Sequence, residues 1–162
     1  MAFIAGKYDV TYNGAEVGQI QEGITIEHQH FGQIITGDNL ADGPQDMVFR
    51  GTAVFVQFNL IEWDQALASA IFSPWGSAYL TQSIKVGNLA SDNWKVLELT
   101  ALSGTPANST TPKTITFDSA ILAENFPVSV LFAPALRTVP IRMRVFPDST
   151  TDYGTANYGT LT

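Results

Sequence analysis

The chain has 162 residues and a formal net charge of −7, with 45% hydrophobic and 14% charged residues. This length predicts one domain with a substantial core, and a charged share below the usual value of about 25% indicates a large β core or a surface that meets other protein. Only eight Lys and Arg residues argue against a nucleic-acid-binding surface, and the lack of Cys excludes disulfides, Cys-ligated metals and a thiol nucleophile.

The first ten residues lack the basic region and the apolar run of a signal peptide. No segment approaches the roughly 18 apolar residues that a membrane helix needs. We therefore expect a soluble protein that is made in the cytoplasm and does not contact a membrane.

The first predicted element is a β-hairpin around Asn13-Gly14, which separates strand-like runs at residues 8–12 and 15–21. Both turn residues tolerate the positive φ of a type I′ turn, which is the turn that best fits two twisted strands. A second strand follows at residues 24–29, where apolar and polar residues alternate. Such alternation is typical of a strand with one buried face and one polar face.

The next segment, Phe31–Met47, is predicted to be a long loop. It contains three Gly, one Pro and three Asp, but also five large apolar residues and no Lys or Arg. Long loops in compact domains are usually functional or disordered, and disorder favours a composition with few apolar residues. We therefore expect an arm that docks on another molecule; the alternative is a loop that packs over its own core.

A long strand and the only good helix follow this loop. The strand is predicted at Val48–Phe58, with apolar residues on both faces of Ala53–Phe58 and a bulge or close approach at Gly51. The core should cover one face, and the following helix or a neighbouring subunit the other. The helix is predicted at residues 59–72, with Asn59 as its N-cap and an apolar stripe at helical spacing.

Later strands are predicted from alternation at Ser77–Val86, Lys95–Leu102, residues 115–121, residues 128–132 and Leu136–Phe146. In the strand at 115–121, Phe117 and Ile121 are expected to face inward and Ala120 outward. Pro140 lacks a backbone donor, which places it at an edge or a strand start. The last residues, 147–162, lack a core pattern, and we expect either a flexible tail or a second arm that orders on a neighbour.

Few residues combine into a chemical site. His28 and His30 share a strand face, but a structural metal site normally has four ligands and no Cys is present. The run from Asp38 resembles a calcium loop, yet Leu40 occupies a ligand position and Phe49 stands where the bidentate Glu belongs. No nucleophile elbow, Walker loop or dinucleotide motif occurs. We therefore expect no enzymatic activity, no metal and no cofactor.

The order of these parts resembles the major tail tube proteins of long-tailed bacteriophages and the related tubes of contractile injection systems. An Asn-Gly hairpin leads into a strand with GITIEH and a long Asp/Gly loop. The long apolar strand FRGTAVFVQFNLIEWDQ then runs into one helix, and a second set of strands follows. The resemblance covers most of the chain. It implies a mainly β domain at residues 1–146, a β-sandwich or barrel with one flanking helix.

The resemblance also implies a function. Subunits of such proteins close into rings, usually hexamers, whose inner strands form a continuous lining. The rings stack around a tape-measure protein into a tube that later carries the genome. For this chain it implies a virion protein of the tail whose partners are further copies, the tape-measure protein, and tail-tip and terminator proteins. DNA would pass through without specific binding.

Carried onto this sequence, the loop at 31–47 would be the arm that bridges subunits or rings. The expected assembly residues are Phe31, Ile34, Ile35, Asp38, Leu40, Asp42, Met47, Phe49, Phe55, Tyr153 and Tyr158. An acidic lumen would repel phosphate, and the candidate lumen acids are Glu27, Glu98 and Asp118.

Alternative functions remain. Within the same class, the chain could be a tail terminator, a tail-tip ring or an injection-system tube. From another class comes a monomeric ligand-binding β-sandwich, which predicts a stable monomer and a melting shift with ligand. An enzyme is the weakest alternative.

Overall fold

The structure is a computed structural model, and it describes residues 8–37, 43–61, 71, 85–102, 113–129, 138–148 and 157–162. Within these ranges the chain is mainly β, as predicted. The helical positions described there are Ile71 and a 3-10 turn at Ala90–Asp92. The strands are β1 (Tyr8–Tyr12), β2 (Ala15–Glu16), β3 (Ile20–Thr36), β4 (Pro44–Leu60), β5 (Lys95–Ala101), β6 (Thr114–Leu122), β7 (Val139–Val145) and β8 (Thr160–Leu161).

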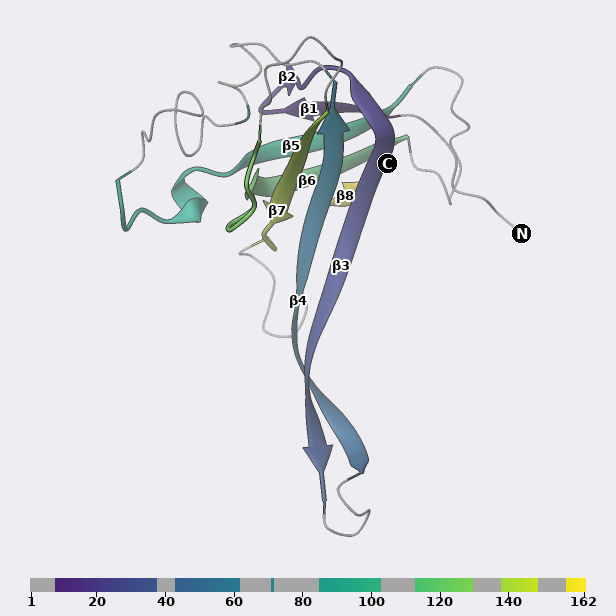
Figure 1. Cartoon of the computed structure of the whole chain (residues 1–162), viewed down its shortest axis with the longest axis vertical. Coiled ribbons are helices and arrows are strands. Elements are labelled where there is room, and N and C mark those ends of the chain that lie inside the picture. Colours follow the sequence, from purple (N-terminus) through teal and green to yellow (C-terminus); the bar gives the residue numbers. More distant parts are fainter. Residues whose placement is uncertain are drawn as a thin grey trace, which may run out of the picture.

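These strands form one antiparallel sheet in the order β2-β1-β5-β6-β7-β4-β3, with β8 beside β6. In Figure 1, β1, β5 and β6 run across the long axis of the molecule, whereas β3 and β4 run along it. The main core lies between these two sets of strands, since it contains Val10, Leu97 and Phe117 from the first and Val56 and Phe58 from the second. β1 and β3 also contact each other, although they are not paired by hydrogen bonds.

The predicted Asn-Gly hairpin is confirmed. Asn13 and Gly14 have φ values of 53° and 78°, the positive pair that a type I′ turn requires. The backbone N–H of Val17 donates to the carbonyl of Val10 at 3.0 Å, and the N–H of Asn13 donates to the carbonyl of Val96 at 2.9 Å. The second bond ties the turn to β5.

The prediction of a loop at Phe31–Met47 is wrong for most of its length. β3 and β4 are 17 residues each and pair from Ile20 and Leu60 out to Thr36 and Pro44. Figure 1 shows this hairpin extending far beyond the rest of the sheet. The loop prediction gave weight to Gly and Pro, but Pro44 is a strand's first residue, where its missing N–H costs least. The centre of the expected loop, residues 38–42, lies outside the described residues.

Glycine at position 32 has a packing role within this hairpin. Gly32 pairs with Phe49, and a Cβ added to Gly32 would lie 2.5 Å from the Sδ of Met47. The side chain of Met47 therefore occupies the space that any larger residue at position 32 would fill.

The predicted irregularity at Gly51 is confirmed. Phe31 pairs with Gly51 and Gly32 pairs with Phe49, so Arg50 is an extra residue on β4. Gly51 has a φ of 138°, a value that side chains disfavour. A second irregularity near the tip leaves Gln45 unpaired, because Ile35 pairs with Asp46 and Thr36 with Pro44.

Both faces of β4 are covered at Ala53–Phe58, as predicted. Val56 and Phe58 belong to the main core, whereas Phe55 belongs to a second cluster with Ala53, Ala123 and the partly buried Phe126. The second cover that the described residues supply therefore comes from the segment after β6.

The expected helix start is wrong, because Asn59 belongs to β4. The strand continues to Leu60, which is fully buried and pairs with both Ile20 and Val139. Ile71 is helical and fully buried in the main core. The remaining helix positions, 62–70 and 72, lie outside the described residues, as do 77–84 and 130–132 of the expected strands. Val86 lies in a turn and Val128 outside any strand.

The strand at 115–121 is confirmed, but its expected alternation is wrong at Ala120. Leu97 pairs with Phe117 and Lys95 with Ala120, which leaves one extra residue on β6. The bulge shifts the alternation by one position, so Ala120 joins Phe117 in the main core. Sequence periodicity alone does not locate such a shift.

The closing strand β7 confirms its predicted pattern. Its inward residues are all buried: Val139, Ile141, Met143 and Val145. Pro140 is the second residue of the strand, opposite Asn59 of β4, and it lies beyond the three positions at which β7 pairs with β6. The carbonyl of Arg142, two residues further on, accepts a hydrogen bond on the β6 side. The nitrogen of Pro140 therefore also points to that side, where β6 does not pair with it, and its missing donor leaves no bond to β4 unmade.

Candidate assembly interface

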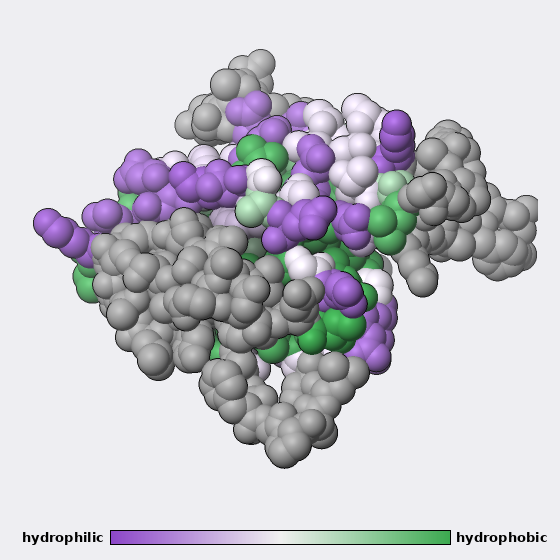
Figure 2. Space-filling view, turned by 90° about the horizontal axis from the view of Figure 1, so that it is seen from above, coloured by the Kyte–Doolittle hydropathy of each residue, from purple (hydrophilic) through white to green (hydrophobic). Residues whose placement is uncertain are grey.

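The outer half of the β3–β4 hairpin, residues 31–37 and 43–50, is called the arm below. Its six large apolar side chains are between 42% and 59% exposed: Phe31, Ile34, Ile35, Met47, Val48 and Phe49. By contrast, Figure 2 views the molecule from the end opposite the hairpin tip, where hydrophilic residues cover much of the described surface. Large exposed apolar side chains gathered in one part of a molecule often mark an interaction site.

The register of the hairpin divides these side chains between two faces. Successive residues point to opposite sides of a strand, and paired residues point to the same side. Ile34 pairs with Met47, and Phe49 lies two residues further along β4, so these three form one face, the Met47 face. Phe31, Ile35 and Val48 form the other, the Val48 face, since Val48 pairs with Gln33 between them on β3.

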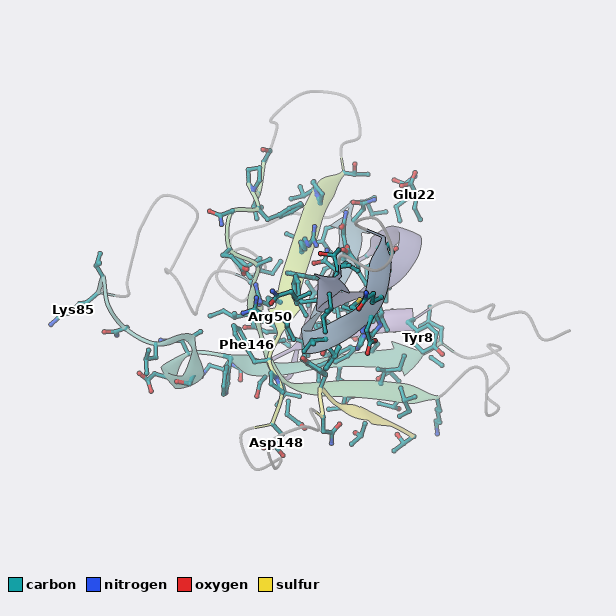
Figure 3. The ribbon with its side chains drawn as sticks, turned by 90° about the horizontal axis from the view of Figure 1, so that it is seen from below. Tyr8, Glu22, Arg50, Lys85, Phe146 and Asp148 are labelled. Atoms are coloured by element: carbon teal, nitrogen blue, oxygen red, sulfur yellow. The ribbon has the colours of Figure 1, made fainter. Side chains whose placement is uncertain are left out.

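The arm is therefore a two-stranded ribbon with three large apolar side chains on each face. Figure 3 looks along the hairpin and shows side chains on both sides of the ribbon, with Arg50 at its bulge labelled. An isolated two-stranded ribbon is marginally stable in water and needs packing against something else.

The exposed area sets the energy that docking would release. Fully burying one large apolar side chain contributes about 1.5–3 kcal/mol, so burying six half-exposed ones contributes roughly 5–9 kcal/mol. Association itself costs about 4–15 kcal/mol. Burying both faces of one arm therefore releases about as much free energy as association costs.

The outer edge of β3 is a second feature that suits assembly. Within the described ranges, β3 is the last strand of the sheet and pairs only with β4. Its other edge therefore presents 17 residues to which a further strand can be added. Long unpaired edges are a hazard for a monomer, and a closed ring removes them.

Several predicted assembly residues are placed differently from expectation. Phe55 is buried, with the Arg142 guanidinium 4.1 Å from its ring centroid, so it offers little surface to a partner. Tyr158 is half-buried, and its hydroxyl donates to the carbonyl of Thr52 at 2.9 Å. Four further predicted residues lie outside the described ranges: Asp38, Leu40, Asp42 and Tyr153. The remaining five are exposed on the arm: Phe31, Ile34, Ile35, Met47 and Phe49.

The end of the chain orders on its own sheet. β8 pairs with β6 through Leu161 with Ile115 and Thr160 with Thr116. Neither a flexible tail nor an arm on a neighbour was the right expectation for residues 157–162, while residues 149–156 lie outside the described part.

The three candidate lumen acids separate into two environments. Glu98 and Asp118 lie on the outward side of β5 and β6, where Asp118 is exposed and Glu98 half-buried. Glu27 lies on β3, and Arg142 holds it in an ion pair at 3.2 Å. Its charge is therefore compensated within the chain.

Glu98 and Asp118 belong to a larger polar surface on β1, β5 and β6, called the acidic face below. Its outward residues are mostly acids and threonines: Asp9, Thr11, Glu98, Thr100, Thr114, Thr116 and Asp118. The exposed Val96 of β5 and, beyond the bulge of β6, the buried Ile121 also lie on this side. Lys95 lies on the opposite side of β5 from this set, the side of Leu97 and Leu99. No Lys or Arg occupies an outward position on these three strands. Phosphate groups near this face would meet negative charge that no ion pair among the described residues compensates.

Sequence reasoning missed two features of the site. Val48 was not among the expected interface residues. It shares a face with Phe31 and Ile35 only because of the register between β3 and β4, which the sequence does not show. The pairing of Glu27 with Arg142 joins residues 115 positions apart, which composition does not reveal.

In the described part of the chain, no group of three or more His, Cys, Asp or Glu residues is arranged to hold a metal ion. None of the helices described is long and apolar enough to cross a membrane.

No protein-family model matches the chain, and no curated protein matches it in sequence.

Proposed function

We propose that this chain is the subunit of a phage-type tail tube, a virion structural protein that assembles with copies of itself into stacked rings. The observation that carries the proposal is the arm, which projects from the domain with exposed apolar side chains on both faces. A monomeric binding module gains nothing from such a ribbon, whereas a subunit that inserts it between neighbours buries both faces.

The domain itself is proposed to be a β-sandwich or barrel completed by one helix. Two observations support this. The strands β1, β5 and β6 cross β3 and β4 with the core between them (Figure 1). Ile71, a residue of the expected helix, is helical and buried in that core.

The acidic face is proposed to line the channel. A genome passing through the tube must slide without binding, and a lining of carboxylates and hydroxyls without Lys or Arg meets this need. Glu98 and Asp118 are the proposed lining acids, whereas Glu27 contributes to folding through Arg142. The partners of the tube would be the tape-measure protein and the tail-tip and terminator proteins, and the chain is proposed to have no enzymatic activity.

Negative-stain electron microscopy of the purified chain over a concentration series, with light scattering alongside, tests the proposal. We expect hollow tubes or stacked rings that grow with concentration. Single rings that never stack would favour a terminator or tail-tip ring. A monomer at every concentration would contradict self-assembly, and a ligand screen by thermal shift would then test the binding-module alternative.

A further inference from the structure

Both histidines of the chain lie side by side on β3 at the base of the arm. Position 28 and position 30 are two apart on one strand, so their side chains share a face. His28 Nδ1 lies 3.3 Å from His30 Nε2, and the two ring centroids are 4.7 Å apart. Both residues are exposed.

Neighbouring aromatic rings hold this pair in place. The ring of Tyr158 meets His28 edge-on at 6.2 Å between centroids, and the ring of Phe49 lies 6.4 Å from that of His30. Tyr158 is itself fixed, because its hydroxyl is bonded to both the side chain and the carbonyl of Thr52. The two imidazoles are therefore positioned before any ligand arrives, which lowers the entropy cost of binding.

The distance between the two nitrogens suits a metal ion. Zinc binds imidazole nitrogen at about 2.0–2.1 Å, and two such bonds to nitrogens 3.3 Å apart enclose an angle of roughly 110° at the metal. That is the tetrahedral angle. In the metal-free contact one nitrogen donates its N–H to the other, so a metal would be bound by the tautomers in which both of these nitrogens carry a lone pair.

We propose that His28 and His30 form a two-nitrogen chelate for a divalent transition-metal ion of the zinc type. No third His, Cys, Asp or Glu joins them among the described residues, so water completes the coordination. The site differs from a structural zinc site, which uses four protein ligands. The inference does not depend on the proposed function, since it rests on the imidazole geometry alone.

The composition of the chain makes the test clean. The chain has two His and no Cys, so no other imidazole or thiolate competes for the metal. Untagged protein is titrated with Zn²⁺ by calorimetry and with Cu²⁺ by electron paramagnetic resonance, where Cu²⁺ is expected to bind most tightly. The variants are His28→Gln, His30→Gln and the double variant, with folding checked by circular dichroism.

We expect one ion per wild-type chain and a Cu²⁺ spectrum with two nitrogen ligands. Each single variant should bind at least about tenfold more weakly, because the second imidazole then no longer binds intramolecularly. Zn²⁺ should raise the melting temperature of the wild type and leave that of the double variant unchanged. Single variants that bind within twofold of the wild type, or a spectrum with one nitrogen, would overturn the chelate.

Discussion

At the scale of single residues, Tyr12 shows how burial sets both packing and response to pH. Its side chain is fully buried, and its hydroxyl donates to the carbonyl of Ala120 at 3.0 Å. Burial raises the pKa of the Tyr12 phenol well above the usual value of about 10, because the charged phenolate would lose its hydration.

This shift predicts a loss of stability in alkali. Above about pH 10 the unfolded chain releases the Tyr12 proton while the folded chain keeps it, so the free energy of unfolding falls as pH rises, by about 1.4 kcal/mol per pH unit. The Tyr12→Phe variant should be about 1–2 kcal/mol less stable at pH 7, because the hydrogen bond is lost. Its stability should fall less steeply above pH 10. Urea melts of both proteins at pH 8–11 measure this, and parallel slopes would contradict the prediction.

Gly159 carries a second prediction at this scale. A Cβ at this position would lie 2.2 Å from the carbonyl oxygen of Thr116, and a backbone atom of a paired strand cannot easily yield. Gly159→Ala should therefore displace β8 from β6, at a cost of about 1–3 kcal/mol. Hydrogen exchange at residues 157–162 should increase strongly. Thr160→Ala, in the same segment but exposed, is the matched control and should leave exchange unchanged.

At the scale of elements, alternation predicted the strands that the chain's own core defines, but not the arm. β5 and β7 each place every second residue in the core, so their period is visible in sequence. The arm has apolar residues on both faces and turn-favouring residues between them, and this sequence pattern predicts a loop. Its faces also depend on the unpaired residues Arg50 and Gln45, and a bulge leaves no sequence period.

The unusual apolar content of the arm is nevertheless visible in the sequence, and its role as an interaction surface stays a prediction. Phe31, Ile34 and Met47 stood out because no period assigned them to a core. Composition therefore predicts that the segment carries apolar side chains outside its own core. Its shape depends on hydrogen bonding along the two 17-residue strands, which composition does not reveal.

The two faces of the arm give a prediction for assembly. One variant replaces Ile34, Met47 and Phe49 of the Met47 face with Thr, which keeps strand preference. The other does the same to Phe31, Ile35 and Val48 of the Val48 face. Each removes roughly 2–4 kcal/mol of docking energy per subunit, so each should raise the assembly concentration about 30- to 900-fold. The melting temperature of the free subunit should change little.

Sedimentation over a concentration series measures this, with Gln33→Thr as the exposed control on the same ribbon. If only one triple variant impairs assembly, the arm lies on a single surface instead of between two. If neither does, the arm is not the connector.

At the scale of the whole molecule, the proposed tube separates two tasks onto two surfaces of the sheet. In this proposal the arm and the outer edge of β3 would supply apolar and backbone contacts for assembly, and the acids of the acidic face form no ion pair among the described residues. Arg142 and Arg144 of β7 point to the same side of the sheet as the acidic face, one strand beyond β6, and both are paired with acids, Arg142 with Glu27 and Arg144 with Glu124. Assembly should therefore survive changes of charge on the acidic face.

This separation predicts the effect of reversing the lining charge. In the Glu98→Lys/Asp118→Lys variant each subunit gains four units of positive charge on the acidic face, and a ring repeats this change in every copy. Tubes should still form, but their channels should now retain DNA fragments, with an affinity that falls steeply as salt rises because phosphate contacts release counterions.

Asp92→Lys, an exposed change on the 3-10 turn outside that face, is the control. Tubes of the wild type and of the control should release DNA alike, as measured by co-sedimentation in 50–300 mM salt, roughly the range over which such contacts weaken. Equal retention by the control would mean that the acidic face does not line the channel.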